Sequence, residues 1–273
     1  MSIIFAMKTK EAKPFVKWAG GKQALVADIV AAMPERFSVY FEPFVGGGSV
    51  FLRLSPGRAK LSDANEWLIQ TYQAIRDDWR RVAGLLDSLP NTKADYLAIR
   101  RIGSSSIDRF QRAAHFVYLN KTCFRGLYRV NRKNEFNVPY GAYDRRYYDP
   151  ENLEAVASAL EDVKFTSGDF ECAIASVTAD DFVYFDPPYY KQGGFADFNR
   201  YTPSQFREGD HFRLAAVCRE LDARGVRWLL SNSDTPFVRE LFDGFEMNAI
   251  SARRDINLKS TKRSINELLI CNY

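Results

Sequence analysis

The stretch SVYFEPFVGGGSVFLRL, residues 38–54, sets an apolar, β-branched and aromatic run before three glycines and a helix-like segment. Adjacent glycines allow a sharp turn and a close approach to a ligand, because no Cβ intervenes. The next short strand, in AKLSDAN, ends at Asp63, where nucleotide-type folds place a carboxylate for ribose hydroxyls. The full G-x-G-x-x-G spacing is absent, so a purely structural turn followed by a solvated Asp63 remains an alternative. The order strand, glycine turn, helix, strand predicts an α/β fold.

The rest of the chain changes character twice. Residues 14–65 and 161–273 alternate apolar strand-like runs with helix-like segments, a pattern typical of a mainly parallel sheet. Residues 66–160 are first helical and then rich in Asn, Gly, Arg and aromatic residues. We therefore expect a loose arm over residues 1–13 and an α/β core that is split by a mainly helical insertion over residues 66–160.

Local patterns predict individual elements of this core. GGKQALVADIVAAM, residues 20–33, has helical periodicity and ends at Pro34. FVYF, residues 182–185, is an apolar run that suits a buried strand. FEMNAI (residues 245–250) and ELLICNY (residues 267–273) predict a final pair of strands.

Composition excludes several classes of protein. The 273 residues include four cysteines, none in a CxxC pair, and two histidines. This argues against a disulfide framework, a zinc site and a His-based catalytic triad. No apolar run reaches the roughly 18 residues of a membrane span. The net charge of +4 does not by itself indicate a nucleic-acid partner. We expect a cytoplasmic protein without a metal site.

The predicted strand of residues 182–185 ends in Asp186-Pro187-Pro188-Tyr189. Proline cannot donate a hydrogen bond to a continuing ladder, so the strand must stop there. The strand end then presents a carboxylate, backbone carbonyls and an aromatic ring together. These groups suit an amine on a heteroaromatic base, because the oxygens can accept its two N–H groups and the ring can stack on the base. A solvent-exposed Pro-Pro turn is the alternative interpretation.

A second glycine turn, FVKWAGGK at residues 15–22, precedes the first predicted helix and places Lys17, Trp18 and Lys22 near its N-terminus. Helix N-termini favour anions, so a ligand carboxylate would suit this turn with the assistance of Lys22. A capped helix start with a core tryptophan is the plainer interpretation.

Five motifs occur in a fixed order: FVKWAGGK, FEPFVGGGSVF, SDAN, YLNKTCFRGLYRVNRKNEFNVPYG and FDPPY. Together they resemble the Dam-type (D12 class, group alpha) DNA adenine-N6 methyltransferases, from about Phe15 to Tyr273. The resemblance implies a Rossmann-like, S-adenosylmethionine-dependent core and an inserted target-recognition domain that binds double-stranded DNA. It implies methyl transfer to N6 of a flipped-out adenine, with GATC as the expected site, and no obligate protein partner.

The resemblance also implies roles for single residues. Asp63 would hold the ribose of the cofactor, Asp169 and Phe170 would lie beside its adenine, and Tyr189 would stack on the target base. The catalytic set is Asp186, Pro187, Pro188 and Tyr189. The cofactor set is Trp18, Lys22, Phe44, Gly46, Asp63, Asp169, Phe170 and Asp186.

Residues 120–148 carry seven Lys or Arg against two acidic residues, a local balance of +5, with seven aromatic residues interleaved. Arginine can pair bidentately with guanine, and an aromatic wedge can fill the gap left by a flipped base. A solvated charged face is the plain alternative. The resemblance implies that Arg129 reads guanine and that Phe124 is the wedge. Arg125 occupies a place where several relatives carry Asn. The implied DNA-binding set is Lys17, Lys121, Phe124, Arg125, Leu127, Arg129, Asn131 and Pro139.

A second basic cluster, residues 253–263, has a balance of +4, and we expect it to contact the DNA backbone. Two other functions remain open from the sequence. One is methylation of another planar amine, such as RNA adenine, cytosine N4 or a glutamine side chain. The other is a catalytically silent DNA-binding regulator, against which the intact Asp63, Asp186 and Tyr189 argue.

Overall fold

The computed structural model describes all residues except 1–10, 104–106, 145, 191–204 and 253–264. The basic cluster at residues 253–263 and most of the predicted N-terminal arm therefore lie outside the described residues.

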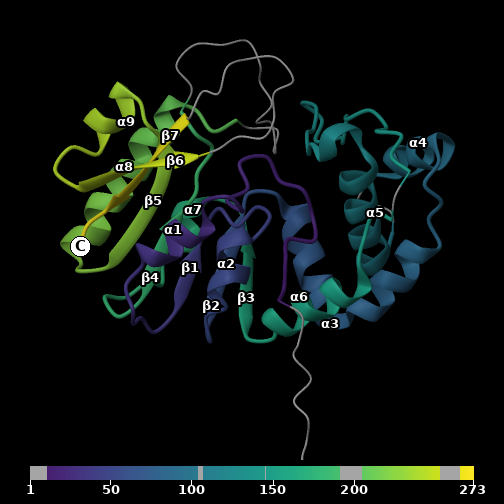
Figure 1. Ribbon diagram of the computed structural model, residues 1–273, viewed down its shortest axis with the longest axis horizontal. Coiled ribbons are helices and arrows are strands. Elements are labelled where there is room, and N and C mark those ends of the chain that lie inside the picture. Colours follow the sequence, from purple (N-terminus) through teal and green to yellow (C-terminus); the bar gives the residue numbers. More distant parts are fainter. Residues whose placement is uncertain (1–10, 104–106, 145, 191–204, 253–264) are drawn as a thin grey trace, which may run out of the picture.

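A seven-stranded sheet forms the centre of the described structure, with the order β3-β2-β1-β4-β5-β7-β6 (Figure 1). Its strands are β1 (Tyr40–Glu42), β2 (Ala59–Asp63), β3 (Val163–Ser167), β4 (Phe182–Phe185), β5 (Arg227–Ser233), β6 (Glu246–Ala252) and β7 (Ile265–Cys271). Strands β1 to β5 pair in parallel, and β7 pairs antiparallel with both β5 and β6. The order is that of a doubly wound, Rossmann-like sheet that reverses between β1 and β4. The predicted fold class and the final strand pair are confirmed.

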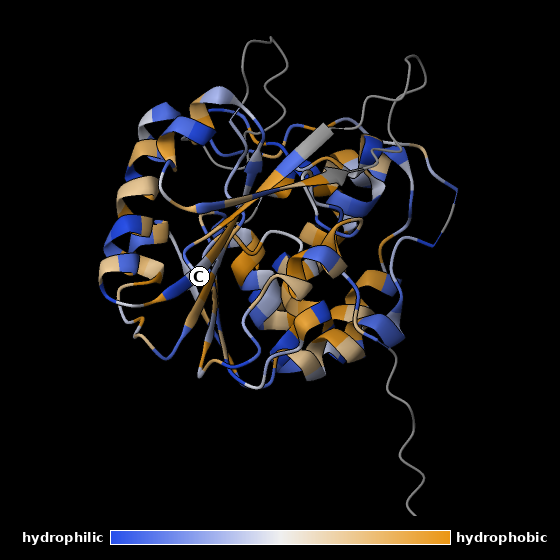
Figure 2. Cartoon of the chain, turned by 60° about the vertical axis from the view of Figure 1, so that its left-hand side comes forward, coloured by the Kyte–Doolittle hydropathy of each residue, from blue (hydrophilic) through white to orange (hydrophobic). Residues whose placement is uncertain are grey.

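Helices cover both faces of this sheet (Figure 1). The α-helices of the described residues are α1 (Val26–Ala31), α2 (Ser49–Leu54), α3 (Glu66–Asp87), α4 (Lys93–Ile102), α5 (Arg109–Thr122), α6 (Pro150–Ala159), α7 (Phe170–Ala173), α8 (Glu208–Ala223) and α9 (Pro236–Leu241), of which α4 and α5 lie away from the sheet (Figure 1). Most show hydrophobic and hydrophilic stretches in alternation (Figure 2), as helices with one buried side do.

Alternation along the strands divides the core in two. In β4, Phe182 and Tyr184 pack in the cluster that contains residues of α1, α2 and α3, whereas Val183 and Phe185 pack in the cluster that contains residues of α7, α8 and α9. All four side chains are fully buried. Burial on both faces explains why this strand is apolar throughout instead of alternating with polar residues.

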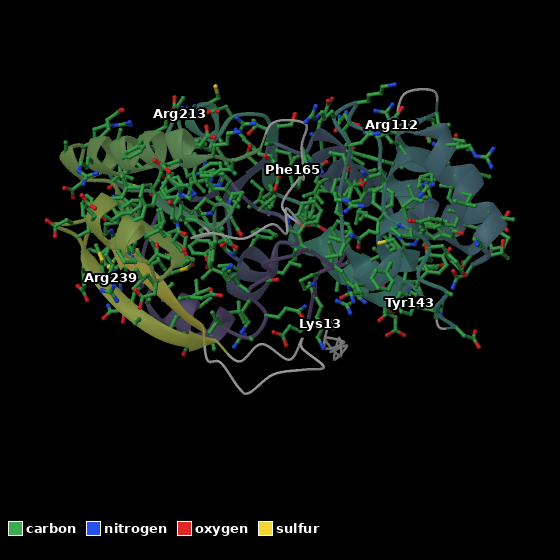
Figure 3. The ribbon with its side chains drawn as sticks, turned by 90° about the horizontal axis from the view of Figure 1, so that it is seen from above. Lys13, Arg112, Tyr143, Phe165, Arg213 and Arg239 are labelled. Atoms are coloured by element: carbon green, nitrogen blue, oxygen red, sulfur yellow. The ribbon has the colours of Figure 1, made fainter. Side chains whose placement is uncertain are left out.

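Helix α3 joins the sheet to the helical section of residues 66–160. Asp78 has non-helical dihedral angles and bends the helix. Before the bend, Tyr72 stacks on Phe165 of β3 with the ring centroids 5.8 Å apart, and the helix also packs against α5 and α6. Seen from above, Phe165 lies between Arg213 on the sheet side and Tyr143 on the helical side (Figure 3). The domain boundary at residues 65 and 66 stays a prediction.

Two elements are shorter than we expected from the sequence. The helix predicted over residues 20–33 is helical only in α1, because residues 18–25 form turns, with Gly21 N donating to Trp18 O and Leu25 N to Lys22 O. The strand expected up to residue 45 ends at Glu42. Pro43 has no N–H for the ladder, and the chain turns there toward the glycines.

Candidate functional site

Three acidic side chains gather where the strand order reverses. Glu42 ends β1, Asp63 ends β2, and Asp186 directly follows β4. In an open α/β sheet, ligands bind in the crevice beyond the carboxyl ends of the strands at this switch point. Burial is the main cause that raises the pKa of each carboxyl, to about 6 for Asp63 and Asp186 and in direction for Glu42. The site is therefore rich in carboxylates that a bound cation would stabilise.

The glycine loop between β1 and α2 needs its glycines. Gly46 and Gly48 have φ values of 48° and 68°, a left-handed conformation that side chains disfavour. A Cβ on Gly46 would lie 2.6 Å from the Trp18 ring, and one on Gly48 would lie 2.7 Å from the Tyr72 hydroxyl. Tyr72 also donates to the Gly46 carbonyl at 3.0 Å. The loop is thus packed tightly against Trp18 on one side and Tyr72 on the other.

Asp63 holds this loop from the neighbouring strand. Its carboxylate accepts Gly46 N at 3.0 Å and Asn65 N at 2.8 Å. An ionised carboxylate has about four acceptor positions, of which these two contacts within the described residues use two. The predicted role as a ribose acceptor is compatible with this arrangement.

Asp186 forms an ion pair with Lys22, at 2.8 Å between Oδ1 and Nζ. Lys22 is buried, and its ammonium also donates to Gly20 O at 2.7 Å. The same ammonium lies 4.4 Å from the centroid of the Tyr189 ring. The Asp-Pro-Pro-Tyr strand end and the FVKWAGGK turn, which are about 165 residues apart in the sequence, therefore meet in one site.

The far end of the Asp-Pro-Pro-Tyr loop is fixed by the last parallel strand. Tyr190 N donates to Asn232 Oδ1 at 3.3 Å, and Ser233 Oγ donates to Tyr190 O at 2.7 Å. The Tyr190 ring stacks on Phe237 with centroids 4.1 Å apart. The Tyr189 hydroxyl donates to Glu267 Oε2 at 2.7 Å. Tyr189 and Tyr190 are thus both anchored by side chains of β5, β7 or α9.

The side chains expected beside the cofactor's adenine lie at the end of β3. Phe170 is buried and its ring centroid lies 5.4 Å from that of Phe44. Asp169 caps α7, and both of its carboxylate oxygens accept from Arg213 Nη2 at 2.9 Å. The structure brings Phe44 and Phe170 together, while the Asp169 carboxylate is paired with Arg213 of α8. Its role stays a prediction.

The helical section contacts the FVKWAGGK turn directly. The side-chain amide of Asn120 on α5, fully buried, accepts Lys17 N and donates to Lys17 O, both at 2.8 Å. The Trp18 ring stacks on Tyr128, with centroids 5.4 Å apart. A Cβ on Gly126 would lie 2.2 Å from the Lys17 side chain. Lys17, expected to bind DNA, and Trp18, expected to bind the cofactor, are therefore both packed against the helical section.

The expected DNA readers lie on one hairpin-like segment after α5. Phe124 is exposed, Arg125 has a φ of 60°, and Phe124 N donates to the carbonyl of Pro139 at 2.8 Å. Arg129 is held by Asn137, which accepts from its Nε at 2.8 Å. The segment thus presents an exposed aromatic ring and an oriented guanidinium.

Other members of the predicted DNA-binding set are partly occupied by the protein itself. The Asn131 side chain accepts Lys133 N and Glu135 N and donates to the Glu135 carboxylate, so it organises the turn of the hairpin. Leu127 is half-buried and its carbonyl accepts the Cys123 thiol at 3.1 Å. Lys121 is half-buried at the end of α5. Whether these residues contact DNA stays a prediction.

Comparison with known proteins identifies the family. The family model for D12 class N6 adenine-specific DNA methyltransferases matches residues 18–256. The chain belongs to this family. Type II methyltransferase M.MjaIII of Methanocaldococcus jannaschii is 40% identical, covering 96% of this chain and all of the relative. The DNA adenine methylase of Haemophilus influenzae is 33% identical, covering 94% and 92%.

Similarity to solved structures is weaker. A precorrin 8w decarboxylase from Methanobacterium thermoautotrophicum superposes with a TM-score of 0.42 at 12% identity, over 96% of this chain and 98% of that one. The strand order of the sheet and the family identify the fold of this D12 class methyltransferase.

Membership of this family makes the chain an adenine-specific DNA methyltransferase, with DNA as its substrate. No helix in the described ranges is long and apolar enough to cross a membrane. The same described ranges contain no group of three or more His, Cys, Asp or Glu side chains that could hold a metal ion.

Four polar residues of the site were not predicted from the sequence: Glu42, Asn120, Asn232 and Glu267. All four are buried and follow or interrupt apolar runs. A polar residue inside an apolar run is the signal that could have singled them out, because such a group is buried only with partners. The partners themselves come from other elements, which a single sequence does not show.

Proposed function

We propose that the chain transfers a methyl group from S-adenosylmethionine to N6 of a flipped-out adenine in double-stranded DNA, with GATC as its site. The observation that carries the proposal is the Asp186–Lys22–Tyr189 cluster at the switch point of the sheet. The residues suit the cofactor, because a sulfonium cation fits a crevice where three carboxyls gather, with Glu42 buried and Asp63 and Asp186 part-buried.

Trp18, Phe44, Gly46 and Asp63 would hold the cofactor, with the ribose on Asp63. When bound, S-adenosylmethionine supplies an electrophilic methyl group. The chain's own residues act on the base. The Asp186 carboxylate accepts one N–H of the adenine amine, the Pro187 carbonyl accepts the other, and the Tyr189 ring stacks on the base. Asp186 can take up the proton that the amine loses. Catalysis is then mainly positioning and hydrogen bonding.

A target amine cannot reach such a crevice while the base is stacked in a duplex, so flipping is part of the proposal. Phe124, exposed on its turn, would fill the gap, and Arg129 would pair with guanine. GATC follows from the match of these readers with those of Dam-type enzymes. A place in a restriction-modification system and a cytoplasmic location are part of the same proposal.

Labelled-methyl transfer to four DNAs tests the proposal: a GATC duplex, the same duplex already methylated at both adenines, its single strand, and a CTAG duplex. We expect label in the unmethylated GATC duplex alone. Equal labelling of CTAG would contradict the site, and strong labelling of the single strand would contradict the duplex requirement.

The matched variant is Asp186→Ala, which should abolish transfer while its circular dichroism and melting temperature stay close to those of the wild type. Substantial transfer by this variant would refute the catalytic assignment. A variant that no longer melts cooperatively would be replaced by Asp186→Asn, which keeps the shape of the side chain and removes its charge.

A further inference from the structure

We infer that Glu267 is a positioning residue of the methyl-transfer site, which fixes the Tyr189 ring in the orientation that receives the target base. Glu267 lies at the start of β7, opposite Ser233 of β5. Its side chain is 7% exposed and its Oε2 accepts the Tyr189 hydroxyl at 2.7 Å. The inference rests on the proposed function, because it concerns the ring that would stack on adenine.

A buried carboxylate in an apolar strand needs a reason. Its neighbours Leu268, Leu269 and Ile270 are core residues, and withdrawing a carboxylate from water is unfavourable unless strong hydrogen bonds compensate. The contact with Tyr189 is a charge-assisted O–H···O bond, a strong type of hydrogen bond. Tyr189 is a half-buried residue beyond a proline pair, so this bond restrains a side chain that its own backbone position does not lock.

The ring is held at two places. Glu267 grips the hydroxyl at one edge, and the Lys22 ammonium lies 4.4 Å from the ring centroid. Lys22 in turn pairs with Asp186. These contacts form one continuous row from the end of β4 to β7, through Asp186, Lys22, Tyr189 and Glu267. A ring that is already fixed loses less freedom when a base stacks on it, which favours the geometry of transfer.

A purely structural role for Glu267 would be to brace β7 against β5. The two roles differ in one respect: a positioning role acts through the Tyr189 hydroxyl, whereas bracing does not depend on it. Tyr189→Phe removes the hydroxyl and keeps the ring. Glu267→Leu removes the acceptor with a side chain of similar size that suits burial, and Glu267→Gln keeps an acceptor without the charge.

The experiment measures kcat, KM for the GATC duplex, melting temperature, and the fluorescence of 2-aminopurine at the target position for the wild type, the three single variants and Glu267→Leu/Tyr189→Phe. We expect Glu267→Leu and Tyr189→Phe each to lower kcat about tenfold, as for loss of one hydrogen bond to a charged group. The double variant should be no slower than the slower single variant, and Glu267→Gln should recover most of the loss.

Two results would overturn the inference. One is a double variant whose loss of kcat is the product of the losses in the two single variants. The other is a loss of kcat in Glu267→Leu that accompanies a lower melting temperature and that is equally large in Glu267→Gln. Glu246→Gln, on the neighbouring strand β6 and exposed, is the control and should match the wild type. The wild-type protein tests the proposed function separately, since absence of transfer there rejects methylation before any variant is compared.

Discussion

Opposing influences set the pKa of the Asp186 carboxyl. Burial raises the pKa of its carboxyl, the Lys22 ammonium lowers it, and the Glu267 charge raises it, with a result of about 6. An exposed aspartate has a pKa of about 4. The folded state therefore binds this proton more tightly than the unfolded chain does, so this group's contribution to stability is largest below pH ~4 and declines as the pH rises through about 6.

The same raised pKa predicts the pH dependence of methyl transfer. The amine needs the carboxylate form of Asp186, so the single-turnover rate should fall as the pH is lowered through about 6. Asp63 has a pKa of about 6 as well. Measuring the rate at saturating cofactor separates the acid limb of the pH–rate profile, which reports Asp186, from the titration of Asp63. In Lys22→Met the limb should move to higher pH, because the lysine favours the charged form. A limb near pH 4 in the wild type would contradict the assignment.

At the scale of elements, two asparagines fasten the segment that leads into the FVKWAGGK turn. Asn120 of α5 binds the backbone N–H and carbonyl of Lys17, and Asn152 of α6 binds those of Lys13 in the same manner, at 2.9 Å each. The first clamp is part-buried, with Asn120 itself fully buried, and the second is exposed. The pair therefore provides an internal comparison of one interaction in two environments.

Asn120→Ala should lower the free energy of unfolding by about 2 kcal/mol, since it removes both hydrogen bonds between a fully buried side chain and the Lys17 backbone. It should also weaken cofactor binding, because Lys17 adjoins Trp18. Asn152→Ala should change either quantity by less than about 1 kcal/mol, since water can replace its amide. Urea unfolding and calorimetric titration with S-adenosylmethionine measure both. Equal effects of the two variants would contradict a special role of the Asn120 clamp.

The sequence was sufficient for the elements whose cause is local. Pro187 and Pro188 end β4 wherever it lies in the fold, and the glycine loop fits only glycine. Contacts between elements that are far apart in the chain could not be predicted from the sequence. The early residues of the predicted helix from residue 20 are turns in which Lys22 is buried and paired with Asp186. Glu267 meets Tyr189 because β7 lies beside β5. Neither partner is visible in local periodicity.

At the scale of the whole molecule, the positive and negative side chains behind the net charge of +4 are unevenly distributed along the chain. The balance of residues 120–148 alone is +5, so the rest of the chain is slightly acidic. Within that segment the basic side chains differ in their surroundings. Arg129 is oriented by Asn137, whereas Arg132 is exposed on the same hairpin. An oriented guanidinium suits base recognition, and an exposed one suits phosphate contact.

This difference predicts two kinds of loss. Arg129→Ala should relax discrimination at the guanine, costing about 1–3 kcal/mol on GATC and much less on variant sites. Arg132→Ala should weaken binding to all duplexes alike and reduce the slope of log K against log salt by about 1. Methylation rates on GATC and single-substitution sites, with binding measured at several salt concentrations, distinguish the two. Equal losses on all sites for Arg129→Ala would refute its role as a reader.

The position of β7 has a consequence for synthesis of the protein. This strand lies between β5 and β6 in the sheet, yet it follows both of them in the chain. While the chain emerges from the ribosome, β5 keeps an unpaired edge until residues 265–271 arrive, and such edges invite pairing with other chains. The carboxylate that grips Tyr189 arrives on the same strand. Closing the sheet and completing the site are therefore one late event, so a prematurely terminated chain would be both aggregation-prone and inactive.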